Sequence, residues 1–416
     1  MIAFFQVLIS VVEFIPYLFN GKTDLRGLIS YQPYLCYMRN PSTRLRIGIL
    51  GGGQLGHMLL QAAANYHVET FVLENDPACP AAHLCHHFTL GDIKDFDAVY
   101  AFGKGLDALT IEIENVNIPA LEKLESEGVT IFPKPSVLKT IKNKILQKQY
   151  YREFQIPTAD FKITNSNAEL VELADFLPAV HKLSEGGYDG RGVQIIRTKQ
   201  DMDKGFGEPA VLEKLISIDK EIAIIVAIND KGETAIYPPV AMLFDPNLNQ
   251  LDYQLCPAEL EKQKLWKIEA MALAVVRNFK SPGIFAVEMF VDRNGDIFVN
   301  ETAPRVHNSG HHTIEAHYSS QFDMLWRVML NYPLGNTNYI LPSVMVNIVG
   351  AEGYSGDVVY EGLEEVLKIE NAFVHLYGKK QTKPGRKMGH VTIMSGEKQD
   401  LLHKSNKIKN SLTVKS

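Results

Sequence analysis

The chain has 416 residues and a formal net charge of −6, so it is long enough for several domains with cores of their own. A negative charge balance argues against a nucleic-acid-binding surface and favours a small-molecule role. The four cysteines follow no regular spacing, which is typical of a reducing compartment. We therefore expect a cytoplasmic protein with neither nucleic acid nor a membrane as a partner.

The first 44 residues differ from the rest. Residues 1–19 are apolar but contain Glu13 and Pro16, and no Lys or Arg precedes Lys22. A signal peptide needs a basic start, and a membrane span needs about 20 uninterrupted apolar residues. We expect residues 1–44 to be a disordered extension, or Met38 to be the working start.

A glycine-rich turn follows the first predicted strand. Residues 46–50, RIGIL, predict a short buried strand. The sequence GGGQLG follows, and a helix to about residue 65 leads into a strand at 68–73 that ends at Glu74. Glycines at this spacing with an acidic residue on the next strand are typical of dinucleotide binding. Alternatively, the glycines let the backbone approach another phosphate at a helix N-terminus. The motif alone does not separate the two.

Residues 109–115 alternate like a strand and carry Glu112, Glu114 and Asn115 toward its end. Ligands bind at the carboxyl ends of strands in open α/β sheets. The other interpretation is an edge strand with solvent-facing glutamates. Beyond a linker at 132–136, Lys142, Lys144 and Lys148 form a charge run of the kind that usually marks a solvated helix face.

Four glycines within seven residues characterise the segment 186–192, GGYDGRG. Glycines at this density make a loop whose free N–H groups can hold phosphates. It lacks the G-K-[ST] ending of a P-loop. Tyr188, Asp189 and Arg191 within it exceed what a plain turn requires, so we favour a functional loop.

Two apolar strands, 285–291 and 297–301, flank Asn294-Gly295. This dipeptide predicts a two-residue type I′ hairpin turn. The resulting register pairs Glu288 with Glu301 and Met289 with Asn300. Opposed carboxylates destabilise a ladder unless a cation such as Mg²⁺ lies between them. The alternative, a solvated hairpin end, is weakened by the polar run that follows (Asn300, Arg305, His307, Asn308, Ser309 and His311).

Cys79, His83, Cys85, His86 and His87 lie close together in the sequence. These residue types bind zinc, but their spacing matches no common structural zinc site. We do not predict a zinc site here.

Taken together, these parts resemble an ATP-grasp enzyme. Over residues 45 to about 394 the chain is similar to the 5-(carboxyamino)imidazole ribonucleotide synthase family, through GGGQLG, GGYDGRG, NETAPRVHNSGHHT, SSQFD and PGRKMGH. His57 stands where the family pattern leads us to expect arginine. The resemblance implies an α/β ATP-grasp fold with a Rossmann-like (pre-ATP-grasp) domain at 45–137, an ATP-grasp domain at 138–335 with a lid at about 178–210, and a small β-rich C-terminal domain at 336–416.

The resemblance also implies roles for individual residues. The metal ligands would be Glu288 and Glu301. The catalytic residues would be Tyr188, Asp189, Arg191, Arg305 and Lys387, with Asp189 as the base. The ATP-binding residues would be Lys144, Lys182, Gly186, Gly187, Tyr188, Asp189, Gly190, Glu213, Lys214, Leu215, Glu221, Asn300 and Glu301. The substrate-binding residues would be Gln54, Leu55, Glu112, Glu114, Asn115, Tyr188, Arg191, His307, Asn308, Ser309, Lys379, Arg386 and Lys387.

The family's reaction uses ATP and magnesium (or manganese) to activate bicarbonate as carboxyphosphate, which carboxylates aminoimidazole ribonucleotide. Such a reaction needs cations around the phosphates and a lid against water. We further expect a homodimer. The main rival functions are an ATP-grasp ligase or transferase with another acceptor and a nicotinamide dehydrogenase using Gly51, Gly53, Gly56 and Glu74. A non-enzymatic ATP-sensing or scaffold protein ranks last, because it would predict a disrupted metal site and both glutamates are present.

Overall fold

The computed structural model describes residues 44–187, 192–244 and 251–416. The predictions for the extension before Arg44 and for Tyr188, Asp189, Gly190 and Arg191 lie outside these ranges. Across the described residues, no helix is both long and apolar enough to cross a membrane.

The N-terminal part is a five-stranded parallel sheet in the order β3-β2-β1-β4-β5. The inner strands are mostly buried, as expected where helices cover both faces of a sheet, whereas the edge strand β3 is mostly exposed. They are β1 Leu45–Leu50, β2 Val68–Glu74, β3 His87–Leu90, β4 Ala108–Ile111 and β5 Thr130–Phe132. The accompanying helices are α2 Gln54–Ala63, α3 Phe96–Gly103, α4 Ile118–Ser126 and α5 Pro135–Lys142. This is the predicted Rossmann-like arrangement.

Strand β4 is shorter than the sequence predicted. It ends at Ile111, which pairs with Leu50 at the end of β1. The chain then turns at Gly51, whose φ is +101°, so β4 has no partner there beyond this point. Glu112, Glu114 and Asn115 therefore lie in the loop at the carboxyl end of the sheet, not on an edge strand.

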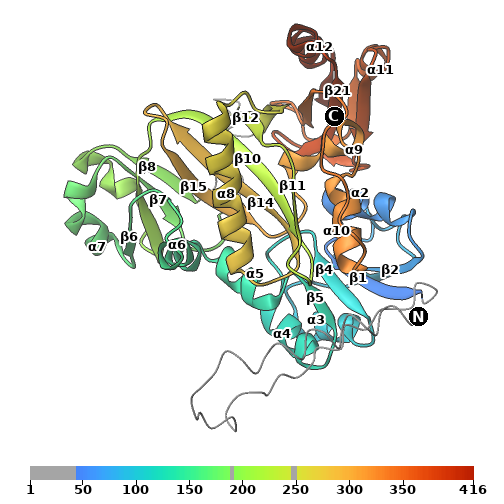
Figure 1. Ribbon diagram of the computed structural model, residues 1–416, viewed down its shortest axis with the longest axis horizontal. Helices are drawn as coiled ribbons and strands as arrows, with labels where there is room; N and C mark the ends of the chain where they lie inside the picture. The colour runs from blue at the N-terminus through green and yellow to red at the C-terminus, as the bar shows by residue number, and fades with distance from the viewer. Residues whose placement is uncertain (1–43, 188–191, 245–250) are drawn as a thin grey trace, which may run out of the picture. The chain divides into compact units, whose positions relative to one another are not determined.

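The next part of the chain forms a four-stranded antiparallel sheet, ordered β6-β9-β7-β8, which lies at the left in Figure 1. Its strands are β6 Phe161–Thr164, β7 Ala179–Leu183, β8 Val193–Ile196 and β9 Ala210–Lys214. Helix α6 (Lys144–Glu153) contacts β9, and α7 (Asn167–Glu172) contacts β6. Strands β7 and β8 flank the predicted glycine-rich loop.

The largest sheet has nine strands, ordered β15-β14-β10-β12-β13-β16-β21-β19, with β11 beside β10. The strands are β10 Ile218–Ile228, β11 Thr234–Ile236, β12 Val240–Phe244, β13 Leu251–Cys256, β14 Gly283–Asp292, β15 Ile297–Ala303, β16 Ser343–Val349, β19 Ala372–Leu376 and β21 Lys387–Met394. Helix α8 (Lys262–Asn278) covers one face over β10 and β14 (Figure 1). Helix α10 (Gln321–Met329) packs on the other face and against α2.

Helix α10 joins the N-terminal sheet to the nine-stranded sheet. Trp326 is fully buried and donates from Nε1 to the carbonyl of Leu59 at 2.7 Å. Its neighbours Phe322 and Leu325 share one core with Ile47 and Ile225. This packing places the loop after β4 beside the loop after β15.

The C-terminal part is β-rich, as predicted, but its main strands are not a separate sheet. Strand β16 pairs with β13, so β16, β21 and β19 extend the nine-stranded sheet. Short strands pair around them, and two helices cover them. These elements are β17 Gly356–Asp357, β18 Val359–Glu361, β20 Gln381–Thr382, β22 Thr413–Lys415, α11 Leu363–Leu367 and α12 Lys398–Ser411.

The β14–β15 hairpin pairs Glu288 with Glu301, as predicted, although two details of the prediction are wrong. The turn has three residues, because Asp292 N donates to Asp296 O and only Gly295 takes a positive φ. Met289 pairs with Val299, which leaves Asn300 as a β-bulge. The extra turn residue shifts the register by one, and the bulge shifts it back before Glu288.

Candidate active site

Many of the predicted site residues line one cleft of about 650 Å³, although Lys182, Glu213, Lys214, Leu215, Glu221 and Asn300 are not among the described residues that line it. It is bounded by the glycine turn, the loop after β4, the start of α6, the end of β7, the β14–β15 hairpin and β21. The predicted residues that line it are Gln54, Leu55, Glu112, Glu114, Asn115, Lys144, Gly186, Gly187, Glu288, Glu301, Arg305, His307, Asn308 and Lys387.

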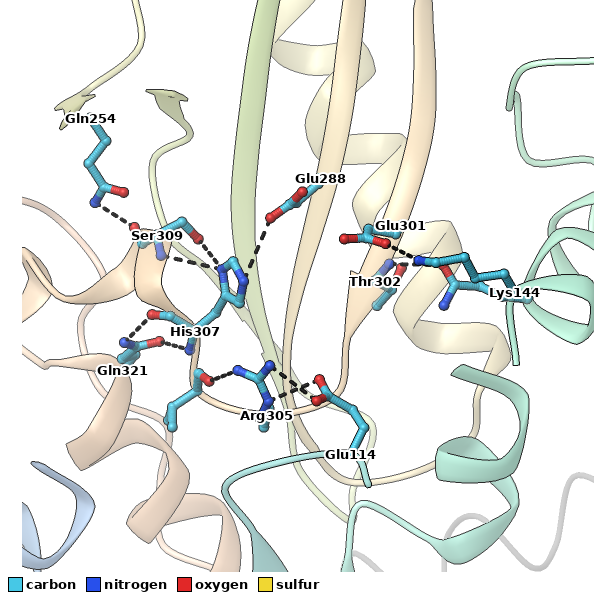
Figure 2. A network of polar contacts seen from close by, with 12 residues as sticks. Glu114, Lys144, Gln254, Glu288, Glu301, Thr302, Arg305, His307, Ser309 and Gln321 are labelled. Atoms are coloured by element: carbon cyan, nitrogen blue, oxygen red, sulfur yellow. Dashed lines mark hydrogen bonds and ion pairs between the residues drawn. The ribbon is translucent and has the colours of Figure 1, made fainter. Parts of the chain in front are cut away.

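Glu288 and Glu301 have opposite electrostatic environments although they face each other across the ladder. Burial, together with the Glu301 charge, raises the pKa of Glu288 to about 8. The Lys144 ammonium, 2.6 Å from Glu301 Oε2, lowers the pKa of Glu301 to about 2. Figure 2 shows this Lys144–Glu301 contact and the neighbouring Glu288 carboxylate. The pair therefore retains a proton at neutral pH unless a further cation binds.

A buried carboxylate positions two further lysines. Glu213 on β9 is 3% exposed, and its oxygens lie 3.0 Å from Lys148 Nζ and 3.1 Å from Lys182 Nζ. Burial opposes ionisation, but the two ammonium groups still hold the pKa of Glu213 below its ordinary value. Lys182 also donates to Asn300 Oδ1 at 3.0 Å, so the bulge residue and Glu301 both face lysines.

Three of the predicted ATP-binding residues, Glu213, Lys214 and Leu215, make polar contacts within the chain. The Glu213 carboxylate is enclosed between the lysines, and the N–H groups of Lys214 and Leu215 donate to the carbonyls of Asp160 and Pro178. Glu221 lies on β10, where burial raises its pKa to about 7. Its charge also contributes to the raised pKa of Glu288, so it is close to the carboxylate pair.

Two hydrogen bonds join the start of α6 to the residues just before the glycine-rich loop. Lys144 N donates to Ser184 O at 2.8 Å, and Asn143 Nδ2 donates to Glu185 Oε1 at 2.9 Å. Gly186 and Gly187, the first two residues of the predicted phosphate loop, line the cleft directly after these contacts. The loop thus leaves β7 beside the helix that carries Lys144.

The glycine turn is occupied by side chains of this chain. Glu112 accepts from Gly53 N and Gly56 N, both at 2.5 Å, and Glu74 accepts from Gly52 N at 2.9 Å. These are the N–H groups that would hold a dinucleotide pyrophosphate. The nicotinamide interpretation is therefore wrong, and Glu112 binds the turn while it also lines the cleft.

Arg305 and Glu114 form a two-point ion pair between the two sheets. Nε lies 2.9 Å from Oε1, and the terminal nitrogen donates to Oε2 at 3.1 Å (Figure 2). Glu114 belongs to the loop after β4 and Arg305 to the loop after β15. A planar guanidinium held at two points has a fixed orientation in the cleft.

Gln321, the glutamine of the SSQFD motif, holds the backbone of His307 through two hydrogen bonds. This contact gives that motif residue a structural role. Its Oε1 accepts from His307 N at 2.9 Å, and its Nε2 donates to His307 O at 2.7 Å (Figure 2). Gly310 permits this contact, because a Cβ there would overlap the Gln321 side chain. His307 Nε2 then lies 3.6 Å from Glu288 Oε1.

Ser309 and Asn308 differ in their surroundings. Ser309 was predicted to bind substrate, but it is 1% exposed and is not among the described residues that line the cleft. Its hydroxyl contacts His307 Nδ1 at 2.9 Å and so orients the imidazole. Asn308 lines the cleft, and its buried Oδ1 has no hydrogen-bond partner among the described residues.

The three basic C-terminal residues also have separate positions. Lys387, at the start of β21, lines the cleft. Lys379 donates to Lys387 O at 2.7 Å, and Arg386 donates to Gln381 O at 2.7 Å. Lys379 thus stabilises the turn that carries Lys387, whereas the described cleft lining does not include Arg386.

Sequence reasoning missed or misjudged several residues. The lysine run was predicted to lie on a solvated helix face. That prediction is wrong for Lys148, which is 3% exposed. Gln147 is buried, lines the cleft and accepts from Thr302 N at 3.1 Å. Lys148 follows Lys144 by four residues, which places both on the same helix face. This spacing was the available signal.

His57 is buried, and its Nδ1 contacts Pro80 O at 2.9 Å.

The fold and the cleft define an ATP-grasp protein. Residues 45–142 match the ribonucleotide synthetase preATP-grasp domain, residues 149–322 the ATP-grasp domain, and residues 343–404 the phosphoribosylaminoimidazole carboxylase C-terminal domain. N5-carboxyaminoimidazole ribonucleotide synthase of Brucella melitensis is 33% identical over 355 residues, covering 83% of this chain and 95% of the relative. The chain belongs to the N5-carboxyaminoimidazole ribonucleotide synthase family.

A longer relative and a solved structure agree with this. The chloroplastic phosphoribosylaminoimidazole carboxylase of Vigna aconitifolia is 35% identical over 364 residues, which are 84% of this chain and 64% of the relative. The chain thus spans just under two thirds of that relative's length. The Aspergillus clavatus N5-carboxyaminoimidazole synthase, solved with ADP and 5-aminoimidazole ribonucleotide, has a TM-score of 0.81 and 31% identity, covering 88% of this chain and 98% of the other.

Proposed function

We propose that the chain carboxylates 5-aminoimidazole ribonucleotide with bicarbonate and ATP, giving N5-carboxyaminoimidazole ribonucleotide, ADP and phosphate. The observation that carries the proposal is that Lys144, Glu288 and Glu301 share one cleft with Arg305 and His307. Lys144, Glu288 and Glu301 suit a nucleoside triphosphate and a cation. Arg305 and His307 suit an anionic acceptor. Family membership supplies the identity of that acceptor.

A divalent cation fits the carboxylate pair. Two carboxyl groups with pKa values of about 8 and about 2 face each other in the ladder, and among the described residues Glu301 alone of the two has a lysine at hydrogen-bond distance. Mg²⁺ takes carboxylate oxygens and leaves other positions to phosphate and water. Glu288 and Glu301 would hold it, and bound there it would offset charge on the phosphates. Mn²⁺ suits the same ligands.

Lysines provide the remaining charge for the nucleotide. Lys144 and Lys182 approach the hairpin from different elements, and Glu213 keeps Lys182 and Lys148 together. Positive charge fixed before the reaction needs little reorganisation when bicarbonate attacks the terminal phosphate. In that step the bond from the β,γ-bridging oxygen to the γ-phosphorus breaks, ADP leaves, and carboxyphosphate forms.

The other end of the cleft suits the acceptor. Donors for an anion such as a ribonucleotide phosphate come from Arg305, His307 and Lys387. The side-chain Oδ1 of Asn308 can accept from an amine or hydroxyl. The exocyclic amine attacks the carboxyl carbon of carboxyphosphate, phosphate leaves, and the nitrogen loses a proton. We propose Asp189 as the base on the strength of the GGYDGRG motif.

Phosphate release with each substrate omitted in turn tests the proposal. We expect ADP and phosphate to form fastest when ATP, bicarbonate and aminoimidazole ribonucleotide are all present, with one carboxylated product formed per ATP consumed. ATP hydrolysis that does not respond to aminoimidazole ribonucleotide, but does respond to another amine or carboxylate, would assign the chain to a different ATP-grasp reaction.

A further inference from the structure

One buried cluster outside the cleft combines three metal-binding side chains. Cys256 at the end of β13, His312 and His317 are 1%, 1% and 3% exposed. One possible ligand atom from each lies within 4.8 Å of the others. They are distant in sequence, which is why no spacing pattern revealed them.

The distance between Cys256 and His317 matches one edge of a tetrahedral zinc site. Cys256 Sγ and His317 Nε2 are 3.6 Å apart. Zinc bonds of about 2.3 Å to sulfur and about 2.0–2.1 Å to nitrogen place those two atoms about 3.6 Å apart on one tetrahedral edge. A thiolate and imidazoles are ligands that zinc prefers over magnesium, so this site differs in chemistry from the carboxylate pair.

The surrounding hydrogen bonds leave ligand atoms available. His317 Nδ1 contacts Thr337 O at 2.9 Å, so that nitrogen carries the proton and Nε2 carries the lone pair facing Cys256. His312 Nε2 is buried and has no hydrogen-bond partner among the described residues. The Ser343 hydroxyl, cross-strand from Cys256, is also buried without one, so it or a water can supply a fourth ligand.

Gln254 connects the cluster to the active site. Its Nε2 contacts Ser309 O at 2.7 Å and His312 Nδ1 at 2.8 Å, while its buried Oε1 has no partner among the described residues. An ion on His312 Nε2 requires a proton on Nδ1, and rotation of the Gln254 amide then provides Oε1 as the acceptor, in exchange for the hydrogen bond from Gln254 Nε2 to Ser309 O. The metal site would therefore lie one layer behind the loop that carries His307.

We propose that Cys256, His312 and His317 bind a structural Zn²⁺ ion that fastens helix α9 to strand β13. His312 and His317 directly flank α9 (Thr313–Ala316), so one ion holds both ends of the helix. The same segment continues from the loop that carries His307 and Asn308, which the ion would stabilise. Zinc enters most readily during folding, because all three ligands are buried.

Cobalt substitution tests the site without relying on turnover. The chain is produced in zinc-depleted medium with Co²⁺, and we expect one tightly held Co²⁺ with a thiolate-to-cobalt charge-transfer band and the visible bands of tetrahedral cobalt. Cobalt at Glu288 and Glu301 has only oxygen ligands and cannot produce the thiolate band. Cys256→Ser should lose that band, whereas Cys85→Ser, which removes a half-buried thiol outside the cluster, should keep it.

A second pair of variants checks the imidazoles and a stability effect. His317→Ala should alter the visible bands and lower the melting temperature, whereas exposed His87→Ala should do neither. Zinc removal from the wild type should lower its melting temperature, and zinc restoration should raise it. The proposal is overturned if wild-type protein takes up no cobalt, if its cobalt shows no thiolate band, or if Cys256→Ser retains the band. Any of these results makes the cluster a hydrogen-bonded thiol–imidazole pair.

Discussion

Arg305 and Glu114 are joined at 2.9 and 3.1 Å across the boundary between the N-terminal sheet and the nine-stranded sheet. Both side chains are largely buried, with 17% and 24% exposure. The pair therefore fixes the guanidinium at the acceptor end of the cleft before substrate arrives. The acceptor end of the cleft lies at this boundary. Its geometry therefore depends on how the two sheets pack.

Glu114→Gln should weaken acceptor binding more than nucleotide binding. The amide cannot neutralise Arg305, so the guanidinium loses its fixed orientation. We expect the KM for aminoimidazole ribonucleotide to rise at least tenfold, about 1.4 kcal/mol, with the KM for ATP changed far less. Steady-state kinetics with each substrate varied measure both. Glu127→Gln, which disrupts an exposed pair with Lys123, is the control and should leave both constants unchanged.

Glu288→Gln and Glu301→Gln should each reduce ATP turnover by a hundredfold or more, roughly 3 kcal/mol of transition-state stabilisation. Each change removes one of two carboxylates that face each other in the ladder. Turnover is measured at limiting and at saturating magnesium. Wild-type turnover by either variant at limiting magnesium would contradict the two-carboxylate site.

Affinity for a divalent cation should rise with pH up to about 8. Burial and Glu301 raise the pKa of Glu288 to about 8, so below that pH the metal-free site holds a proton that the ion must displace. Above it the carboxylate is already ionised, and affinity should level off. Calorimetric titration with Mn²⁺ in buffers of different ionisation enthalpy measures affinity and proton release. Affinity that is independent of pH on both sides of 8 would contradict this assignment.

The same protonation predicts how metal-free stability depends on pH. The folded pKa of Glu288 is above its unfolded value of 4.5, so between 4.5 and about 8 the folded state binds more protons than the unfolded state. This group's contribution to stability is greatest at low pH and is lost as pH rises through that window. Glu288→Gln should therefore gain stability relative to wild type as pH increases, as chemical unfolding can measure.

A shortened chain beginning at Met38 should fold and turn over like the full chain. The first described strand begins at Leu45, and it packs in a core with other described residues that follow it in the chain. Thermal unfolding and phosphate release on both chains provide the comparison. Lost solubility or activity on shortening would show that the first 37 residues contribute to the fold.

Asp189→Asn should separate ATP binding from carboxylation. The amide keeps the size of the side chain but cannot take the proton from the amine. We expect near-normal affinity for ATP and magnesium and at least a hundredfold less carboxylated product. If Asp189 only stabilises a turn, binding and product formation should weaken together. Near-normal product formation would remove the residue from the mechanism.

Local patterns in the sequence were enough for the fold class and for most of the cleft. The apolar run at 45–50 followed by glycines predicted the first βαβ unit, because strand periodicity and turn glycines are properties of short segments. Asn294-Gly295 likewise predicted the hairpin that carries Glu288 and Glu301. The correct pairing nevertheless came from a two-residue turn and an unbroken ladder, and the structure has neither.

Tertiary structure alone decided what surrounds each charged group. Lys148 belongs to a run of lysines that resembles a solvated face, yet packing against β9 places it beside Glu213. Glu112 resembles a substrate ligand, yet the parallel pairing of β1 and β4 brings it onto the glycine turn. Cys256 and His317 are 61 residues apart and meet only because β13 pairs within the nine-stranded sheet beside α9. Burial and partner charges arise from contacts between distant segments, and a linear pattern carries no information about them.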